Sequence, residues 1–159
     1  MNIRLAPLLL LPFLTLPACA MDAGEPISPP VATNAQCFGA DGKSQTYAAS
    51  EDAYVDLAGV WDRCASTLTD LPSDVAGVSF QGKIAQFMVR DVSGNLVPGA
   101  GSAYQRSVQL RLDPQGIVIV LADSDGSFAT YSAQITATPH RLRIENTTTH
   151  AYLTLGARI

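Results

Sequence analysis

The sequence predicts one all-β domain: an antiparallel up-and-down meander that closes into a small barrel or a strongly curved sheet, with a short helical turn near its N-terminus. Two observations indicate this fold. Of the 159 residues, 47% are hydrophobic and 15% are charged, which is enough apolar material for a single core. In the second half of the chain, short alternating or β-branched runs are separated by turns that contain Gly, Pro, Asn or Asp.

The chain begins with the pattern of an export signal, over residues 1–18. Arg4 supplies a positive charge, and residues 5–16 are uncharged and mostly apolar. Such a run is too short to cross a hydrocarbon core of about 30 Å as a helix. Pro7 and Pro12 would each remove a helical hydrogen bond, which argues against a buried N-terminal helix.

The end of this segment, Leu16–Pro17–Ala18–Cys19, resembles the lipobox of bacterial lipoproteins. The resemblance implies cleavage before Cys19, a diacylglycerol on its thiol and an acyl chain such as palmitate on the new amino group. Several acyl chains anchor a protein firmly. The next residue is Ala20 and not Asp, which resembles signals routed to the outer membrane, so we expect an envelope protein anchored there by lipid. The alternative is ordinary cleavage at Ala18–Cys19–Ala20, which also offers small residues.

Cys37 and Cys64 remain as a pair if Cys19 carries lipid. Exported proteins fold in an oxidising compartment, so an even pair of cysteines predicts a disulfide. That bond would close a loop of about 28 residues, which the chain-entropy model values at about 3–4 kcal/mol. The alternative is two free thiols in the core.

Composition divides the rest into a tether, residues 19–35, and a globular domain, residues 36–159. The tether contains three prolines and no hydrophobic periodicity, which is typical of a flexible segment. Early in the domain, Ser50–Glu51–Asp52 is typical of the start of a helix, here a short turn through Leu57. Residues 59–64 predict a strand that carries Trp61, and residues 65–74 predict a loop or a short helix.

Six further strands are expected after residue 82. The first, residues 83–90, is followed by a loop over residues 92–101, and the second, residues 104–112, alternates clearly. Asp113–Pro114–Gln115–Gly116 suits a type I turn, and the β-branched run 117–121 predicts a strand buried on both faces. The last three strands should point these residues inward: Ala129, Tyr131, Ala133, Ile135 and Ala137; Leu142 and Ile144; Leu153 and Leu155. With a strand at 59–64 and an eighth strand, the sheet would close and lose its exposed edges.

Gly59–Val60–Trp61 resembles the Gly-x-Trp start of lipocalin-like barrels. The resemblance implies a small lipocalin-like barrel whose first strand carries the Trp at the closed end. The small bacterial metalloprotease-inhibitor barrels share the motif and carry one disulfide, although here Cys37 precedes the Trp. Independently of the resemblance, we expect Trp61 to be a structural core residue, since a large buried side chain mostly packs.

The sequence contains no catalytic constellation. Gly-x-Ser-x-Gly, HExxH and CxxC motifs do not occur, and His140 and His150 each fall at a predicted turn. Asp123–Ser124–Asp125–Gly126 resembles part of a calcium loop, but it lacks the later ligands and predicts a turn. We therefore expect neither an enzyme nor a metal or cofactor site.

The formal net charge of −4 argues against nucleic-acid binding. The sequence thus predicts a membrane-anchored bacterial envelope lipoprotein whose non-catalytic β domain binds a partner protein or a small apolar ligand. The alternatives are a structural envelope lipoprotein without a ligand and a protease-inhibitor-like barrel. An apolar cavity would favour a ligand, and a filled interior with an exposed apolar patch would favour a protein partner.

Overall fold

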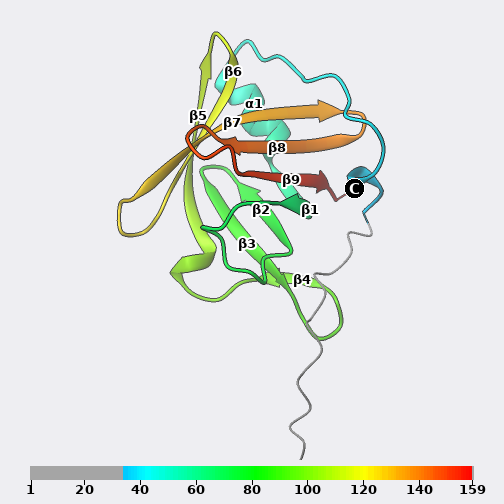
Figure 1. Cartoon of the computed structure of the whole chain (residues 1–159), viewed down its shortest axis with the longest axis vertical. Helices are drawn as coiled ribbons and strands as arrows, with labels where there is room; N and C mark the ends of the chain where they lie inside the picture. Colours follow the sequence, from blue (N-terminus) through cyan, green and yellow to red (C-terminus); the bar gives the residue numbers. More distant parts are fainter. Residues whose placement is uncertain (1–33, 159) are drawn as a thin grey trace, which may run out of the picture.

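The computed structural model describes residues 34–158, so Cys19, the predicted export signal and most of the predicted tether lie outside the described residues. Within that range the chain is mainly antiparallel sheet with one short α-helix, as the sequence predicts (Figure 1). The elements in chain order are η1 (Ala35–Cys37), α1 (Ser50–Leu57), β1 (Gly59–Ser66), β2 (Gly77–Gln81), β3 (Ile84–Arg90), β4 (Leu96–Pro98), η2 (Ser102–Tyr104), β5 (Gln105–Asp113), β6 (Gly116–Ala122), β7 (Phe128–Ala137), β8 (His140–Asn146) and β9 (Tyr152–Ala157).

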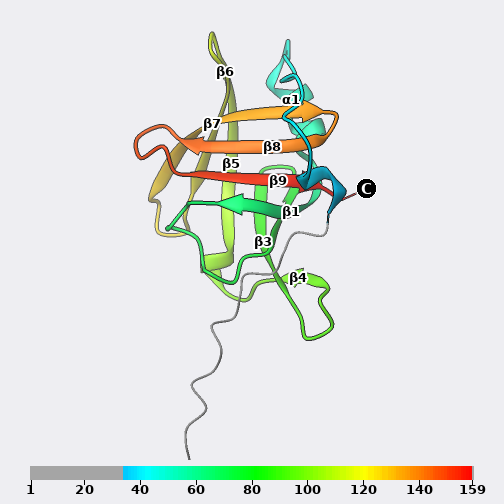
Figure 2. The same cartoon turned by 45° about the vertical axis from the view of Figure 1, so that its right-hand side comes forward.

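All strands but β4 form a closed barrel, which confirms the predicted closure (Figures 1 and 2). Neighbouring strands follow the order β2-β1-β9-β8-β7-β6-β5-β3, and β2 pairs with β3 to complete the ring. β4 pairs only with the end of β3, on the side where β5 pairs with the beginning of β3. In this ring β1 and β9 lie opposite β5 and β6, so the two pairs form opposing walls.

The six predicted strands of the meander correspond to β3 and to β5 through β9, which are neighbours in this order in the sheet. β5 and β6 meet in a tight hairpin in which Asp113 pairs with Gly116, at the turn that the sequence indicates. Along β5, Val108 and Leu110 point inward and are buried, as alternation predicts. β6 is also buried on its outer face at Val118, which is 8% exposed, so the continuous β-branched run is indeed covered on both faces at this point.

The structure adds two strands that the sequence analysis did not place. β4 lies inside the predicted loop 92–101, where its three residues and Pro98 give too short a pattern to recognise. β2 supplies the eighth strand of the ring, and its first four residues are all buried, so it shows no alternation. Residues 65–74 are not a helix, because β1 continues to Ser66 and a loop follows it.

Helix α1 covers one end of the barrel, next to the part of β5 that extends beyond β3. Ala53 and Leu57 belong to the same apolar cluster as the inward residues of the strands. The Tyr54 hydroxyl takes the place of a neighbouring strand: it donates to the Val108 carbonyl at 3.3 Å and accepts from the Leu110 amide at 2.9 Å. The helix therefore fills a gap in the ladder of backbone hydrogen bonds.

The loop of residues 67–76, which we call the mouth loop, lies over the other end. Its apolar side chains pack on the core: Leu68, Leu71 and Val75. Two tyrosines hold its carboxylates. The Tyr131 hydroxyl donates to Asp70 at 2.8 Å, and the Tyr104 hydroxyl lies 2.8 and 2.9 Å from the two carboxylate oxygens of Asp74. The mouth loop is thus fastened both by apolar contacts and by hydrogen bonds.

Candidate functional site

The barrel interior is filled with side chains. The largest of those under 2% exposed are Trp61, Tyr131, Phe87, Leu57, Ile119, Ile135, Leu142, Leu153 and Leu155. Close packing of this kind is how protein cores gain dispersion energy. Helix α1 and the mouth loop lie over the two ends of the barrel.

Trp61 is part of this core, as the sequence analysis expects. It lies on β1 with 1% exposure, and its indole nitrogen donates to the Leu57 carbonyl at 2.8 Å, at the end of α1. The His140 ring packs edge-on against it, with ring centroids 5.0 Å apart. His140 therefore differs from the expected solvated turn residue: it begins β8, and its Nε2 atom is buried without a hydrogen-bond partner among residues 34–158.

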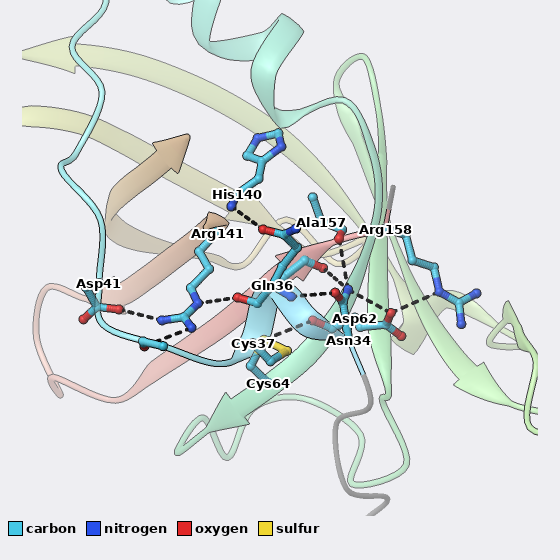
Figure 3. Close-up of a disulfide and its surroundings, with 12 residues drawn as sticks. Asn34, Gln36, Cys37, Asp41, Asp62, Cys64, His140, Arg141, Ala157 and Arg158 are labelled. Carbon is cyan, nitrogen blue, oxygen red and sulfur yellow. Dashed lines mark hydrogen bonds and ion pairs between the residues drawn. A yellow bond between two sulfur atoms is a disulfide. The ribbon is translucent and has the colours of Figure 1, made fainter. Parts of the chain in front are cut away.

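Residues 34–47, which we call the strap, run along the outside of the barrel from β1 towards β7. The predicted disulfide is present and joins Cys37 of the strap to Cys64 of β1, with Cα atoms 5.2 Å apart (Figure 3). Gly156 of β9 lies directly beneath. A Cβ atom at that position would come within 3.2 Å of the Cys37 sulfur, so glycine permits the close approach.

Arg141 on β8 binds the strap from below. Its guanidinium donates to the carbonyls of Gln36 and Gly39 and pairs with Asp41 at 2.9 Å. The side chain is 8% exposed, so this cation is buried under the strap rather than solvated on the outer face of a strand (Figure 3). The Gln36 side chain also accepts from the His140 amide at 2.6 Å. A buried charge needs such a full set of partners.

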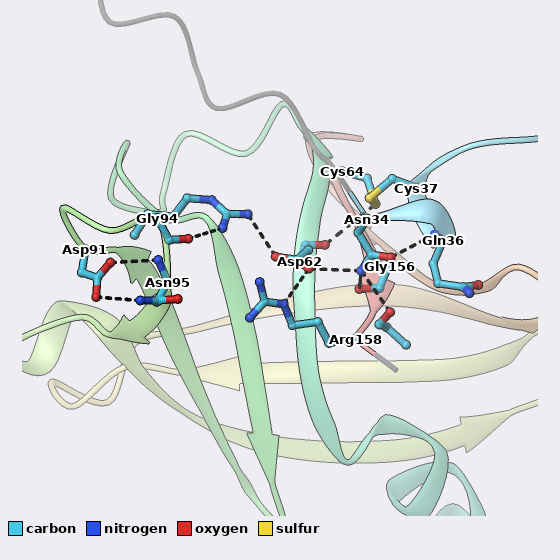
Figure 4. A network of polar contacts seen from close by, with 12 residues as sticks. Asn34, Gln36, Cys37, Asp62, Cys64, Asp91, Gly94, Asn95, Gly156 and Arg158 are labelled. Carbon is cyan, nitrogen blue, oxygen red and sulfur yellow. Dashed lines mark hydrogen bonds and ion pairs between the residues drawn. A yellow bond between two sulfur atoms is a disulfide. The ribbon is translucent and has the colours of Figure 1, made fainter.

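Asp62 on β1 anchors the beginning of the strap (Figure 4). Its side chain is 6% exposed and pairs with Arg90 at 3.1 Å and Arg158 at 3.0 Å. The Asn34 amide nitrogen donates to the same carboxylate at 3.1 Å and to the carbonyls of Gly156 and Ala157. Asn34, which falls at the end of the predicted tether, is therefore already bound to the barrel.

The strap divides the outer surface of the barrel into two parts. We call the outer face of β8, β9 and β1 beneath the strap the covered wall. Charged side chains lie on it in bonded pairs, namely Asp62 with two arginines and Arg141 with Asp41. The strap then continues to β7, where Gln45 donates its amide to the Ile135 carbonyl at 2.7 Å.

On the opposite side, the outer face of β5, β6 and β7, together with Ile84 at the start of β3, forms what we call the open wall. Its outermost row follows the register of four strands: Ile84 pairs with Ser107, Ser107 with Ala122, and Ala122 with Phe128. Ile84 is 44% and Phe128 is 71% exposed, so two large apolar side chains end one row of small residues.

A shallow hollow of about 240 Å³ lies in this row. It is lined by Ile84, Gln105, Arg106, Ser107, Ala122 and Ser124. Arg106 is turned away from the wall, because its guanidinium pairs with Asp123 at 2.7 Å and lies over the Phe87 ring. The hollow is therefore lined by apolar and neutral polar groups and by one cation, which is paired with Asp123. Such a surface suits an apolar side chain of a protein partner.

The other segments considered for metal binding or catalysis, Asp123–Gly126 and His150, form a turn and a surface contact. Asp123–Gly126 forms the β6–β7 turn, in which Asp125 accepts from the Ser127 amide at 2.8 Å and hydroxyl at 2.7 Å. His150 has an exposed side chain and contacts Glu145 at 3.2 Å, where the pair lowers the pKa of Glu145. Within residues 34–158, no three His, Cys, Asp or Glu side chains gather in the manner of a metal site.

Two tyrosine hydroxyls are held in their neutral form by their surroundings. Burial and the hydrogen bond to Asp70 raise the pKa of Tyr131. Burial and the hydrogen bond to Asp56, at 2.8 Å, likewise raise the pKa of Tyr47, which fastens the end of the strap to α1. A phenolate next to a carboxylate would place two negative charges together, so both contacts are structural hydrogen bonds.

Sequence reasoning missed Asp62, Arg141, Ile84 and Phe128. The two charged residues occupy outward positions of their strands, where a solvated charge is the ordinary expectation, and their partners are up to 105 positions away. For Ile84 and Phe128 a signal exists, because each is a large apolar residue at an outward position at the beginning of a strand. An apolar residue in the polar phase of an alternating strand is a cue for an exposed contact.

Among residues 34–158, no helix has both the length and the apolar character needed to cross a membrane. Compared with known proteins, the chain matches no family model, no curated protein and no solved structure.

Proposed function

We propose that this protein is a lipid-anchored lipoprotein of the bacterial envelope whose barrel binds a partner protein through the open wall without catalysis. The observation that carries this proposal is the contrast between a filled interior and an exposed apolar row. A barrel that holds a small ligand keeps an apolar cavity of about 300–1,000 Å³. Here aromatic and aliphatic side chains fill that space, and Ile84 and Phe128 remain exposed on one row outside.

The lipid anchor is supported by the Leu16–Ala18–Cys19 pattern. Asn34 is bonded to β1 and β9, so the segment that leads back to Cys19 joins the barrel on the side opposite β5 and β6. The open wall thus lies across the barrel from the point at which the anchor segment arrives. We propose the outer membrane as the site of anchoring, from the residue after Cys19.

The anchor is tested by fractionation of cells that express the full chain. Wild type should be found in the membrane fraction, with acyl groups on an N-terminal peptide that begins at Cys19. Cys19→Ser should be released or left unprocessed. A mature N-terminus elsewhere, without acyl mass, would refute the lipoprotein assignment and leave the barrel unaffected.

The binding surface is tested by co-purification from detergent-extracted membranes, with protein and lipid both analysed. Phe128→Glu should lose the bound protein, because a carboxylate in an apolar contact is left desolvated. Val55→Glu is the matched control, since Val55 is 74% exposed on α1 and is not one of the residues of the open wall. Equal recovery of protein with both variants would contradict the proposal, and recovery of lipid alone would favour the small-ligand alternative.

A further inference from the structure

The open wall is almost free of charge. Except for Val118, which is buried, its outward residues are exposed or half-buried. Apart from Arg111 and Asp113, both on β5, they are neutral: Ile84, Ser107, Gln109, Val120, Ala122, Phe128, Thr130 and Ser132. The described chain elsewhere carries its charges on the covered wall, the strap, the loops and α1. A protein with a formal net charge of −4 repels its own copies, and a neutral face is where that repulsion is weakest.

We propose that the partner bound by the open wall is a second copy of this chain, in a symmetric face-to-face dimer. This inference rests on the proposed function, because it names the occupant of the same surface. In a two-fold dimer the same patch is used by both copies, so the patch must be complementary to itself. The register of the strands supplies that self-complementarity.

Consider a two-fold axis that runs along β6 in the plane between two facing walls. β6 then faces β6 of the second copy, and the apolar side chains Val120 and Ala122 meet their equivalents. β5 faces β7 of the other copy. The cross-strand pairs Gln109–Val120 and Val120–Thr130 show that the amide of Gln109 then faces the hydroxyl of Thr130. Neutral polar groups therefore meet groups with which they can form hydrogen bonds.

The same axis places Phe128 over Ser107 of the second copy. Ser107 lies in the hollow between Ile84 and Ala122, so each Phe128 would enter the other copy's hollow. The same axis also keeps Arg111, the one cation of the wall, from facing the Arg111 of the second copy. Arg111 pairs with Val118, which pairs with Ser132, so Arg111 faces Ser132 and not a second Arg111. No like charges are brought together, which is a requirement for close contact.

The area of the wall sets the strength of the dimer. The three strands that face each other, β5, β6 and β7, are together about 14 Å wide at about 4.8 Å per strand and about 31 Å long for nine residues at about 3.4 Å, which gives roughly 440 Å² per copy. Stable dimers bury about 800 Å² per partner, so this contact is weak in dilute solution. Anchoring on one membrane raises the effective concentration of the copies, which can populate a weak contact without any new interaction. The dimer is therefore expected on membranes rather than in dilute extracts.

The test uses site-specific photo-cross-linking of the full, anchored chain in membranes. A photoreactive phenylalanine analogue replaces Gln109 on the open wall, or Val55 on α1 as the control. The expected result is an adduct of twice the mass of the chain at Gln109, with peptides of this chain on both sides, and none at Val55. Adding Phe128→Glu should reduce that adduct about tenfold, since an aromatic side chain that fills a hollow on the partner is worth at least this factor.

The possible failures are distinguishable. An adduct at Gln109 with a different protein would overturn the second copy as partner and leave the proposed function standing. The absence of any adduct at Gln109 would overturn both. The circular dichroism spectrum of Phe128→Glu should match that of wild type, because the replaced side chain is 71% exposed. If the spectrum is changed, Ile84→Glu, at the other end of the row, replaces Phe128→Glu in the cross-linking experiment and should reduce the adduct in the same way.

Discussion

The covered wall and the open wall belong to one barrel, and their strands have the same alternation, yet they use their outward residues in opposite ways. On the covered wall, Asp62 and Arg141 are buried beneath the strap and satisfied by long-range partners. On the open wall the outward residues are small or neutral, and Phe128 remains 71% exposed. A sheet face is therefore defined by what covers it as much as by its own sequence.

The difference has an energetic reason. Burying a charge costs several kcal/mol unless hydrogen bonds and a counter-ion replace the lost water. The strap supplies these partners to Arg141, and the disulfide keeps the strap in place. Nothing of this kind is needed for Ser107, Gln109 or Thr130, whose neutral side chains tolerate both water and contact with a protein. The covered wall is built for stability, and the open wall is suited to reversible association.

The largest loss of stability is expected where the covered wall meets the core. Trp61→Ala should lower the free energy of unfolding by about 3–5 kcal/mol, because a large cavity opens next to α1 and His140. Urea unfolding followed by circular dichroism measures it. Ser132→Ala on the open wall is the control and should change the value by less than about 0.5 kcal/mol. A similar small change in Trp61→Ala would mean that the Trp is not a core residue.

The second-largest loss of stability is expected when the disulfide that joins the strap to β1 is removed. Cys37→Ser combined with Cys64→Ser should cost about 3–4 kcal/mol, since the unfolded chain regains the freedom of a closed loop. Wild type treated with a reductant should show the same loss. Two alkylatable thiols in the native, oxidised protein would contradict the disulfide.

The buried carboxylate of the covered wall should have a smaller effect. Asp62→Asn should cost about 1–2 kcal/mol, because Arg90 and Arg158 are partly exposed and regain some hydration. Glu145→Gln provides a matched control, as Glu145 also contacts two basic side chains, Arg143 and His150, but on the exposed surface, where such pairs contribute little. Equal effects of both substitutions would show that burial beneath the strap does not increase the contribution of the Asp62 ion pairs to stability.

Alkaline pH tests the tyrosines that hold the strap and the mouth loop. The pKa values of Tyr47 and Tyr131 are raised in the folded protein, so the stability that they contribute is present below about pH 10 and is lost as the pH rises through the raised values. Unfolding free energies measured at increasing pH should fall only above pH ~10. Tyr131→Phe should flatten part of that fall, and an unchanged profile in this variant would exclude Tyr131 as its source.

The smallest effect on stability is expected on the open wall. Phe128→Ser should change the free energy of unfolding by no more than about 0.5 kcal/mol, because its side chain is already exposed to water. The same substitution should weaken binding in the co-purification assay. A large loss of stability would mean that Phe128 supports the barrel and is not a contact kept free for a partner.

Much of the fold can be read from the sequence because alternation and turn chemistry are local. The hairpin at Asp113–Gly116 and the inward side chains Leu142, Ile144, Leu153 and Leu155 follow from patterns within single strands. β2 and β4 do not, since one is buried on both faces and the other has three residues. Short elements acquire their structure from the neighbouring strand that pairs with them.

The candidate site follows less directly. The Cys37–Cys64 disulfide could be predicted, because the number of cysteines and the pattern that predicts export are both properties of the sequence. The open wall could not, since its row joins residues from four strands that are up to 44 positions apart in the chain, between Ile84 and Phe128. Only the register of the pairing brings these side chains into line.

By itself, the sequence determined the fold class, the disulfide and the inward face of each long strand, because these depend on periodicity, turns and composition. The tertiary structure alone decided which outward face is covered. Whether Arg141 is a solvated surface charge or a buried one depends on where a strap more than 90 residues earlier in the chain passes, with Gln36, Gly39 and Asp41 as its partners. Contacts between distant segments are set by packing, and no local pattern encodes them.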